Sequence, residues 1–299
     1  MSQTLTYSPP VISVDVEDWP QSSWDRDLPI TPRAAQNTER ILSVLGASGV
    51  RATMFVLGKF AQTFPAVVKR VRAEGHEVAC HGHGHIEIFK QSREEFAVDL
   101  SRAKNILEDI LGEPVKGYRA PDFSVVRGTL WALEVIAELG FEYDSSIFPV
   151  RRPRYGIPDW PISPVRLCFG GSRELFEVPI ATFRYWGKNW PVGGGGYHRL
   201  LPGFMSRSLA RTVMSSAPFI FYCHPYELDP AEFKEIFVKV PMQVRLHQGL
   251  GRRWFTQRLG KFLKALGGSA PATKRCIVIG PKDKLTDLRS TIEDFFRQR

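Results

Sequence analysis

The stretch ATMFVLGKFAQTFPAVVKRVRAEGHEVACHGHGH, residues 52–85, contains the pattern that decides the fold. Its apolar start, residues 52–57, predicts a strand, and residues 65–74 carry valines at helical spacing. Gly75 ends that helix, and residues 77–80 predict a second strand that leads into a turn of histidines and glycines. A strand, a helix and a second strand in this order predict a parallel β/α unit.

The same order of elements recurs through the first 145 residues. Residues 11–16 predict the first strand, and Pro32 is placed to open the helix that follows it. Ser92 and Glu95 form a capping-box pattern, which predicts the start of a long helix that ends near Gly112. We expect further strands at 115–119, 141–143, 175–180 and 219–223, and further helices at 129–139 and 252–266.

The composition is that of a folded protein with a basic surface. Of the 299 residues, 43% are hydrophobic and 24% are charged, which excludes intrinsic disorder. The chain has 40 Lys and Arg against 31 Asp and Glu, a formal net charge of +9, which favours anionic partners such as phosphorylated or nucleotide-linked molecules. There is no zinc-finger spacing, RNP motif or basic heptad region, so we expect no nucleic-acid partner.

The sequence also bears on location. No apolar run approaches the roughly 18 residues that a membrane span needs. The first ten residues, MSQTLTYSPP, lack the basic and apolar regions of a secretory signal, and the four cysteines form no CxxC pair. From these features we expect a cytoplasmic protein in a reducing compartment.

Residues with catalytic or metal-binding side chains follow the predicted strands. In a β/α barrel the carboxyl ends of the strands meet at one mouth, where such enzymes carry their active sites. Side chains that are far apart in the sequence are therefore expected to converge there: Asp15, Glu17, Asp18, His81, His85, Arg119, Asp144 and His224.

The histidines and the first acidic cluster together suggest a metal site. His81 and His85 are spaced so that both can reach one ion, whereas His83 would point elsewhere. Taken alone, this pair is equally well explained as surface histidines in a glycine-rich turn. The acids at 15–18 favour the metal site over surface histidines, because one of them can complete the site while another acts as a general base.

Three further residues have candidate roles. Arg119 can pair with and orient the catalytic carboxylate, and Asp144 can hold Arg119 in turn, although a purely structural Arg–Asp pair is the alternative. His224 follows an apolar strand and is flanked by proline and aromatic residues, which makes it a candidate general acid. The alternative for His224 is an ordinary histidine at the barrel rim.

The order of these motifs resembles a known family. The segments are DVED (15–18), HGHGH (81–85), GYRAPDFS (117–124), YDSSIFP (143–149) and FYCHPYE (221–227). In this order they resemble the polysaccharide deacetylases, the NodB-like carbohydrate esterase family 4, and within it the branch associated with exopolysaccharide and O-antigen gene clusters. The resemblance covers the chain from about residue 10 to about residue 230.

The resemblance implies an α/β fold and an activity. The fold is a distorted β/α barrel of seven or eight strands with a C-terminal helical extension. We expect a catalytic domain at residues 1–240, with a Pro/Gly-rich insertion at about 150–200, and an extension at 241–299 that packs on the barrel. The implied enzyme is a hydrolase of non-peptide carbon–nitrogen bonds that removes an N-acetyl group from an amino sugar, with one divalent ion, zinc or alternatively cobalt or nickel.

The resemblance also assigns roles to individual residues. His81 and His85 match the metal histidines, Arg119 the arginine that orients the base, Asp144 the acid of the fourth motif, and His224 the catalytic acid. The first motif departs from the usual adjacent aspartates. One alignment makes Glu17 the base and Asp18 a ligand, and the other makes Asp15 the base and Glu17 a ligand. We favour Asp15 as the base with Asp18 or Glu17 on the metal, and we assign Asp18 as the ligand.

Alternative functions remain open at this point. The same fold occurs in metal-independent hydrolases of cyclic amides of the allantoinase type, and a non-catalytic glycan-binding protein is a third possibility. Both metal histidines are retained here, which argues against the second reading. Candidates to stack on sugar rings, each of which could instead belong to the core, are Phe123, Trp186, Trp190 and Tyr197.

The expected cytoplasmic location narrows the substrate. We expect an N-acetylated sugar linked to a nucleotide or a lipid diphosphate, whose phosphates suit a basic protein. Residues 251–266, GRRWFTQRLGKFLKAL, form a basic amphipathic helix. This helix is expected either to lie on the anionic inner face of the membrane or to pack its apolar stripe against the barrel.

Overall fold

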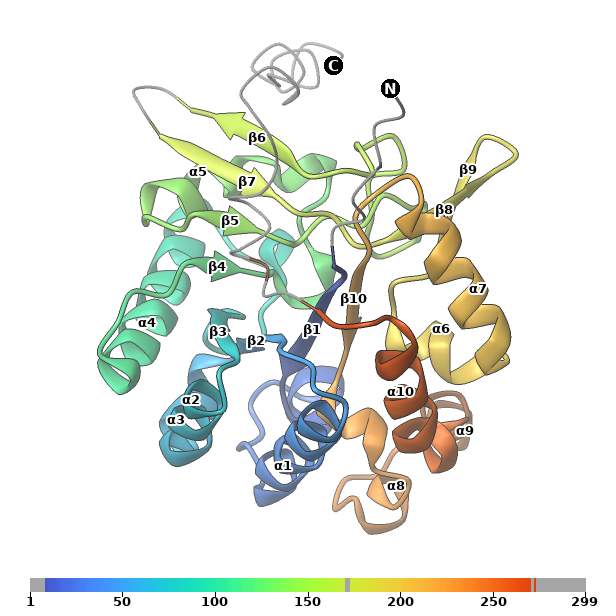
Figure 1. Cartoon of the computed structure of the whole chain (residues 1–299). Coiled ribbons are helices and arrows are strands. Elements are labelled where there is room, and N and C mark those ends of the chain that lie inside the picture. The colour runs from blue at the N-terminus through green and yellow to red at the C-terminus, as the bar shows by residue number, and fades with distance from the viewer. Residues whose placement is uncertain (1–8, 170–172, 270–271, 273–299) are drawn as a thin grey trace.

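The main sheet is a curled layer of eight strands. The structure is a computed structural model, and it describes residues 9–169, 173–269 and 272. The strands lie in the order β10-β1-β2-β3-β4-β5-β7-β6 (Figure 1). Their bounds are β1 Val11–Val16, β2 Thr53–Val56, β3 Glu77–Cys80, β4 Gly117–Tyr118, β5 Tyr143–Asp144, β6 Val165–Cys168, β7 Glu174–Glu177 and β10 Ile220–Cys223.

Every neighbouring pair in this sheet is parallel except β6 and β7. The strand order follows the chain from β1 to β5, and β10 returns to pair with the free side of β1. A separate antiparallel hairpin is formed by β8 Thr182–Tyr185 and β9 Lys188–Pro191. Ala181 donates a backbone hydrogen bond to Ile220 and Gly193 accepts one from Tyr222, so the segments before β8 and after β9 lie against β10.

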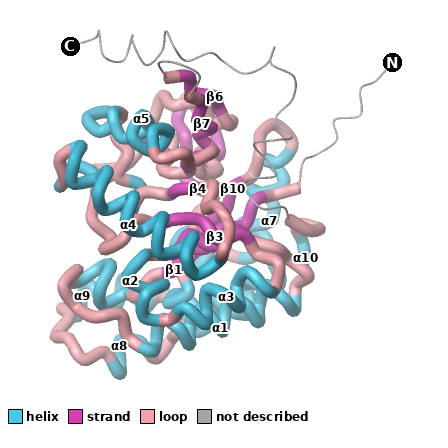
Figure 2. Tube along the Cα trace, turned by 90° about the vertical axis from the view of Figure 1, so that its left-hand side faces the viewer, coloured by secondary structure: helices cyan, strands magenta, loops and turns pink. Residues whose placement is uncertain are grey.

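Helices cover the outer face of the sheet (Figure 2). Their starts follow local chemistry: Pro32 opens the first, and the Ser92–Glu95 capping box opens the longest, which ends at Gly112 in a left-handed conformation. The helices are α1 Pro32–Ala47, α2 Gly58–Thr63, α3 Pro65–Ala73, α4 Arg93–Leu111, α5 Trp131–Glu138, α6 Gly195–Leu200, α7 Gly203–Met214, α8 Glu232–Glu235, α9 Met242–Gly249 and α10 Arg252–Ala265.

The strands have apolar side chains on both faces, because one face meets the helices and the other lines the barrel interior. In β1, Ile12 and Val14 belong to the large cluster beneath the helices, whereas Val11 belongs to the interior cluster with Phe55. Alternation with a period of two residues therefore directs Asp15 to the interior. The fold thus places a carboxylate at the end of β1, inside the mouth of the barrel.

The predicted fold class is confirmed. Strands β1 and β3 have the predicted bounds, and α4 and α10 differ from the predicted helices only at their ends. The sequence did not predict the short α2, the antiparallel β6, the β8–β9 hairpin or helices α6, α7, α8 and α9. The expected domain division at residue 240 stays a prediction, and residues 273–299 of the expected extension lie outside the described part of the chain.

The structure decides between the two expectations for helix α10. Its apolar stripe is buried, and the helix contacts α1, α6 and α7. The second expectation, that this stripe packs against the barrel, is therefore confirmed, so a membrane contact of the helix, which stays a prediction, cannot use these side chains. The buried side chains of this stripe are Phe255, Leu259, Phe262 and Leu263. Across the described residues, no helix is both long enough and apolar enough to span a bilayer.

Candidate active site and metal centre

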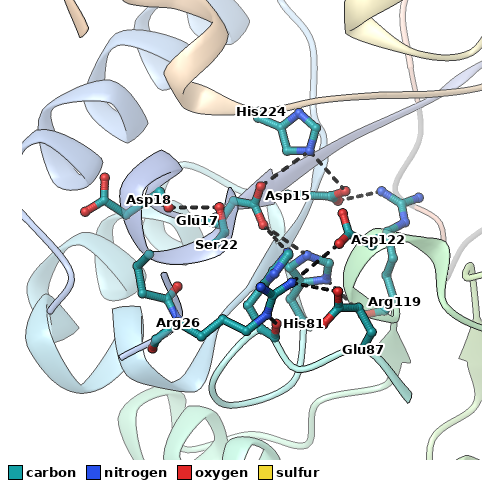
Figure 3. A network of polar contacts seen from close by, with 12 residues as sticks. Asp15, Glu17, Asp18, Ser22, Arg26, His81, Glu87, Arg119, Asp122 and His224 are labelled. Carbon is teal, nitrogen blue, oxygen red and sulfur yellow. Dashed lines mark hydrogen bonds and ion pairs between the residues drawn. The ribbon is translucent and has the colours of Figure 1, made fainter. Parts of the chain in front are cut away.

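The side chains at the carboxyl ends of β1, β3 and β10 surround one cavity of about 420 Å³. Figure 3 shows that Glu17 lies between His81 on one side and His224 on the other. Of the residues selected from the sequence, the cavity is lined by Asp15, Glu17, His81, His85 and His224.

Three buried side chains form a group that can hold a metal ion. One ligand atom from each of Glu17, His81 and His85 lies within 4.8 Å of the others. Glu17 Oε2 lies 2.6 Å from His85 Nε2 and 3.5 Å from His81 Nε2. Burial alone would raise the pKa of Glu17, but the charge of His85 and hydrogen bonds from both histidines hold it well below its usual value. The site therefore favours an ionised carboxylate beside two imidazoles.

The backbone around the histidines sets their orientation. His81 Nδ1 lies 2.8 Å from the backbone oxygen of Arg119, so a proton on Nδ1 leaves Nε2 free to bind a cation. His85 adopts a left-handed conformation, with φ of 60°, which is uncommon for a residue with a side chain. The turn is held by Gln21, whose amide donates to the Gly84 oxygen, and by Arg26, whose Nε donates to the His85 oxygen.

These residues fit a divalent ion of the zinc type. Two imidazoles and one carboxylate are the protein ligands of a catalytic zinc site with an open position. All three side chains are buried, and the hydrogen bond at His81 Nδ1 is the usual support for a metal-bound imidazole. The same donors accept cobalt or nickel, so the residues do not distinguish among these ions.

The position of Asp18 corrects our assignment of it as a metal ligand. Its Oδ2 accepts a hydrogen bond of 2.6 Å from the Thr31 backbone N–H, just before helix α1. In Figure 3 the Asp18 carboxylate points away from the histidines. The physical reason is that β1 ends at Val16, so Glu17 continues the inward face while Asp18 turns outward. Glu17 is the first-motif acid that lies with His81 and His85.

Asp15 forms a buried ion pair with Arg119. Arg119 Nη1 lies 2.7 Å from Asp15 Oδ1 and also donates to Ser13 Oγ at 2.9 Å. The other guanidinium nitrogens donate to the backbone oxygen and hydroxyl of Ser145 at 2.9 Å each. The guanidinium also stacks 4.1 Å from the centre of the Phe55 ring. Asp15 is therefore held rigidly with its second oxygen facing the cavity.

His224 faces both first-motif acids from the opposite wall. Its Nε2 lies 4.0 Å from Asp15 Oδ2 and 3.6 Å from Glu17 Oε1. Its Nδ1 lies 3.0 Å from Glu227 Oε1, and its ring stacks on Tyr226 with centroids 4.7 Å apart. Burial alone would lower the pKa of His224, but the Glu227 hydrogen bond and the nearby carboxylates raise it to about 9. A histidine so placed is protonated at neutral pH and can give up a proton from Nε2.

Glu227 is the residue that the sequence analysis missed. It stands in the FYCHPYE motif three residues after His224, which is the spacing of one helical turn, here the 3₁₀ turn Pro225–Leu228. Besides His224, its carboxylate faces Arg199, whose Nε lies 3.2 Å from Oε2. Burial alone would raise the pKa of Glu227, but the hydrogen bond and charge of His224, together with Arg199, lower it.

Asp144 does not line the cavity, and it does not hold Arg119 as predicted. Its carboxylate accepts hydrogen bonds from the hydroxyl and backbone N–H of Ser146, and it shares a hydrogen bond with Glu177 of β7. Both acids are fully buried, and burial raises the pKa of each, most strongly that of Glu177. Asp144 therefore belongs to the wall of the barrel, where β5 pairs with β7.

The cavity rim is basic and aromatic. Arg26 pairs with the buried Glu87 at 2.8 Å, and Arg154, whose side chain is 68% exposed, pairs with Asp122 at 2.9 Å. Of the aromatic residues considered for sugar stacking, Phe123 lines the cavity, whereas Trp186 belongs to the turn between β8 and β9. The other aromatic residues of the lining are Trp19, Trp24, Tyr155, Tyr222 and Tyr226.

Each half of the chain matches a known family model. The family model for polysaccharide deacetylase matches residues 10–143. This part of the chain, just under half of its length, is therefore similar to the polysaccharide deacetylases. A second model, described as a domain of unknown function (DUF3473), matches residues 145–267, which include His224 and Glu227.

Curated relatives resemble part of this chain. A peptidoglycan-N-acetylglucosamine deacetylase of Bacillus cereus is 34% identical over 98 residues, which are 32% of this chain and 36% of that protein. A chitooligosaccharide deacetylase of Azorhizobium caulinodans is 29% identical over 85 residues, 28% of this chain and 40% of that protein. The chain thus spans well under half the length of these two relatives, and the likeness supports a deacetylase domain.

Solved structures show the same fold across nearly the whole chain. A Mycobacterium smegmatis protein named for the polysaccharide deacetylases is 18% identical, with a TM-score of 0.56 over 99% of this chain and 93% of that one. The Puue allantoinase is 14% identical, with a TM-score of 0.58 over 89% of this chain and 88% of that one. At these identities the comparison establishes the fold alone.

Proposed function

We propose that the protein is a metal-dependent hydrolase that removes the N-acetyl group from an amino sugar in a glycan or a glycan precursor. The observation that carries this proposal is the convergence of three units on one cavity: the Glu17–His81–His85 group, the Asp15–Arg119 pair and the His224–Glu227 pair. An ion site, a base and an acid are the parts that metal-assisted hydrolysis of an amide uses.

Asp15 is the proposed general base. Arg119 holds one of its carboxylate oxygens, so the other is free to accept a proton from the attacking water. The proposal keeps the preferred sequence assignment of Asp15 and takes the second of the two alignments of the first motif, with Glu17 rather than Asp18 at the ion. Arg119 is a positioning residue in this scheme, because its donors meet Asp15, Ser13 and Ser145.

His224 is the proposed general acid. An amine is a poor leaving group unless it is protonated, and His224 Nε2 faces the same space as the free oxygen of Asp15. Glu227 accepts from Nδ1, which fixes the ring and favours the protonated form. Glu227 therefore has a positioning role toward His224.

The proposed ion site consists of Glu17, His81 and His85. An ion bound there supplies Lewis-acid chemistry for hydrolysis of the acetyl group. The side chains themselves provide two neutral imidazoles and one negative charge, which leaves a net positive charge on the loaded site. That charge favours the carbonyl oxygen of the acetyl group as the atom that faces this side of the cavity.

We infer further that the sugar carries an anionic group, as a nucleotide- or lipid-linked precursor does. Arg154 lines the catalytic cavity and also a neighbouring cavity, which has three further cationic side chains in its lining, Lys90, Arg127 and Arg152. Tyr155 lies in both linings as well, so the two cavities adjoin. Phosphate oxygens suit such arginines, and the cytoplasmic location expected for these precursors stays a prediction.

The test is acetate release from N-acetylglucosamine oligosaccharides and from a nucleoside-diphosphate-linked N-acetylhexosamine. We expect turnover to disappear after chelation and to return with zinc, cobalt or nickel in a ratio of one ion per chain. Arg154→Ala should raise KM for the diphosphate-linked sugar several-fold more than for the neutral oligosaccharide. Full turnover in a metal-free preparation would contradict the metal-dependent mechanism.

Two other functions are tested by the same preparation. A metal-independent hydrolase of cyclic amides would open allantoin without an ion, and the Glu17–His81–His85 group argues against it. A non-catalytic glycan-binding protein would bind sugar without releasing acetate. The buried Asp15–Arg119 pair and the His224–Glu227 pair argue against that function, because binding alone does not need an aligned base and acid.

A further inference from the structure

A second cavity lies on the far side of helix α6 from the catalytic cavity. It measures about 490 Å³ and opens between α6, α7 and α10. Helix α10 contacts both α6 and α7, and the three helices lie side by side in Figure 1. Helix α6 separates the two cavities, because Gly196 and Arg199 line the catalytic one while His198 lines this one. We call this region the α7–α10 surface, with the lining His198, Gly203, Phe204, Arg207, Trp254, Gln257, Arg258, Lys261 and Phe262.

Large apolar side chains are exposed at this surface. Phe204 of α7 is 67% exposed and Trp254 of α10 is 53% exposed, and both line the same cavity. Leu200 and Leu250, four residues before Phe204 and Trp254, are exposed too. The chain segments that carry these two leucines are in contact, because Gly251 packs closely on Arg199. Exposing such a group of apolar side chains to water is unfavourable in free energy, and a patch of this kind is typical of an interaction site.

The charge around these residues has a single sign. The lining contains Arg207, Arg258 and Lys261 and no acidic residue. Among the residues that the structure describes, Arg207 and Lys261 have no ion-pair partner, whereas Arg258 donates to the backbone oxygen of Arg199. At least two of the three cations are therefore available to an anionic ligand.

A buried polar group also lines the cavity. His198 is only 3% exposed, and its Nε2 has no hydrogen-bond partner within the described part of the chain. Its ring lies against Phe221, Phe255 and Phe262. Burial lowers the pKa of His198 to about 4, so the ring is neutral at pH 7. An apolar group can therefore cover this ring without burying a charge.

We propose that the α7–α10 surface binds the protein to an anionic phospholipid bilayer. Phe204 and Trp254 would enter the interface, where aromatic side chains are favoured, while Arg207 and Lys261 would meet lipid phosphates. The buried stripe of α10 takes no part, because it packs on the barrel. The side chains that contact lipid are instead those on the outer side of α10, together with α7.

This placement connects the bilayer with the catalytic cavity. Helix α9 contributes Val244 and Gln248 to the catalytic lining, and its exposed Leu246 precedes Leu250 by one helical turn. The catalytic cavity and the α7–α10 surface therefore lie on two sides of helix α6. Binding to the bilayer does not depend on the proposed deacetylase function, but it would bring the cavity close to a lipid-linked sugar.

The experiment is co-sedimentation of the full chain with vesicles of phosphatidylcholine alone or of phosphatidylcholine with phosphatidylglycerol. We expect binding to the anionic vesicles that falls at high salt, and little binding to the neutral ones. The double variant Phe204→Ser/Trp254→Ser should lose at least ten-fold in affinity. The matched control is Trp186→Ser, which removes a tryptophan that is 87% exposed on the β8–β9 hairpin and should bind as the unmodified protein does.

A second pair of variants tests the charge. Arg207→Gln/Lys261→Gln should weaken binding to anionic vesicles and reduce its salt dependence, whereas Lys69→Gln/Arg102→Gln, on α3 and α4, should not. Equal binding to neutral vesicles, or equal loss in the control variants, would overturn the proposal. It would also fail if no vesicle were bound and light scattering instead showed a dimer that Phe204→Ser/Trp254→Ser dissociates. Thermal unfolding of each variant checks that it is folded.

Discussion

Residues 10–143 and 145–267 contribute to the same cavity in different ways. The first region repeats strand and helix in order, and the ends of its strands provide the proposed ion ligands and the base. The second region contains the antiparallel β6–β7 pair, the β8–β9 hairpin and several short helices. It provides His224 and Glu227 and the Arg154–Tyr155 part of the wall.

This difference suggests that the two regions have separate functions, ion binding in the first and proton donation in the second. Glu17, His81 and His85 all precede residue 143, so ion binding should depend on the first region alone. Proton donation depends on the second region, whose His224 faces Asp15 and Glu17 of the first region across the cavity. Substitutions at the ion ligands of the first region should therefore reduce both metal content and turnover. Substitutions in the second region should reduce turnover alone.

The largest effect is expected in the first region. His85→Ala should remove the ion and reduce turnover by more than about 10³-fold, because one of three ligands is lost and the Lewis-acid chemistry goes with the ion. The matched control is His83→Ala, since His83 belongs to the same motif but is not part of the ligand group. Metal analysis and acetate release on both variants give the answer. Equal loss of metal in the His83 variant would contradict the assignment.

Asp15 should behave differently although it lies in the same region. Asp15→Asn keeps the shape but cannot accept the proton, so turnover should fall by about 10²–10⁴-fold while the ion stays bound. Glu17→Gln should instead lose the ion. If the Asp15 variant loses its ion and the Glu17 variant keeps it, the two roles are exchanged.

Changes in the second region should reduce turnover at full metal content. His224→Ala is expected to cost about 10²–10⁴-fold in kcat. Glu227→Gln should cost about 10–100-fold, because it weakens the support of the ring but leaves the acid in place. Glu227→Asp should restore part of this loss. A fall in bound metal in either the His224 or the Glu227 variant would show that the two regions do not act separately.

The sequence predicted the regular first region better than the second, for physical reasons. The apolar runs at β1 and β3 have glycine, proline or polar residues at their ends, and Ser92 with Glu95 marks the start of α4 without reference to any tertiary contact. The order of β/α units also predicts which strand ends converge. That is why Asp15, His81 and His85 were found together.

Other features depend on contacts that no local pattern contains. Glu17 and Asp18 are adjacent acids, and only the end of β1 and the Thr31 N–H decide which of them faces the histidines. Arg154 and Tyr155 lie in an irregular proline- and arginine-rich segment without periodicity. Glu227 could have been found, since an acid three residues after a histidine in a turn is placed to contact it.

The smallest predicted effect concerns the boundary between the two regions. Asp144 of β5 and Glu177 of β7 share a hydrogen bond in the barrel wall, and Glu177 Oε1 also accepts from the Ile147 backbone N–H. Burial and the charge of Asp144 raise the pKa of Glu177 well above its usual value, so Glu177 holds a proton in the folded state. A protonated acid and a glutamine offer similar groups here, one acceptor and one donor.

Glu177→Gln should therefore preserve the fold and change how its stability depends on pH. A carboxyl group whose pKa is raised on folding contributes its full stability below its unfolded pKa, about 4.3, and loses it as the pH rises through the folded pKa. The free energy of unfolding of the unmodified protein should thus fall as the pH rises above the unfolded pKa, and fall less in the variant. Denaturant titrations at several pH values measure both slopes. Glu174→Gln, on the same strand but exposed, is the control and should keep the slope of the unmodified protein. An unchanged slope in Glu177→Gln would mean that the acid pair does not hold its proton, and that the boundary between the regions is stabilised by the neighbouring apolar side chains alone.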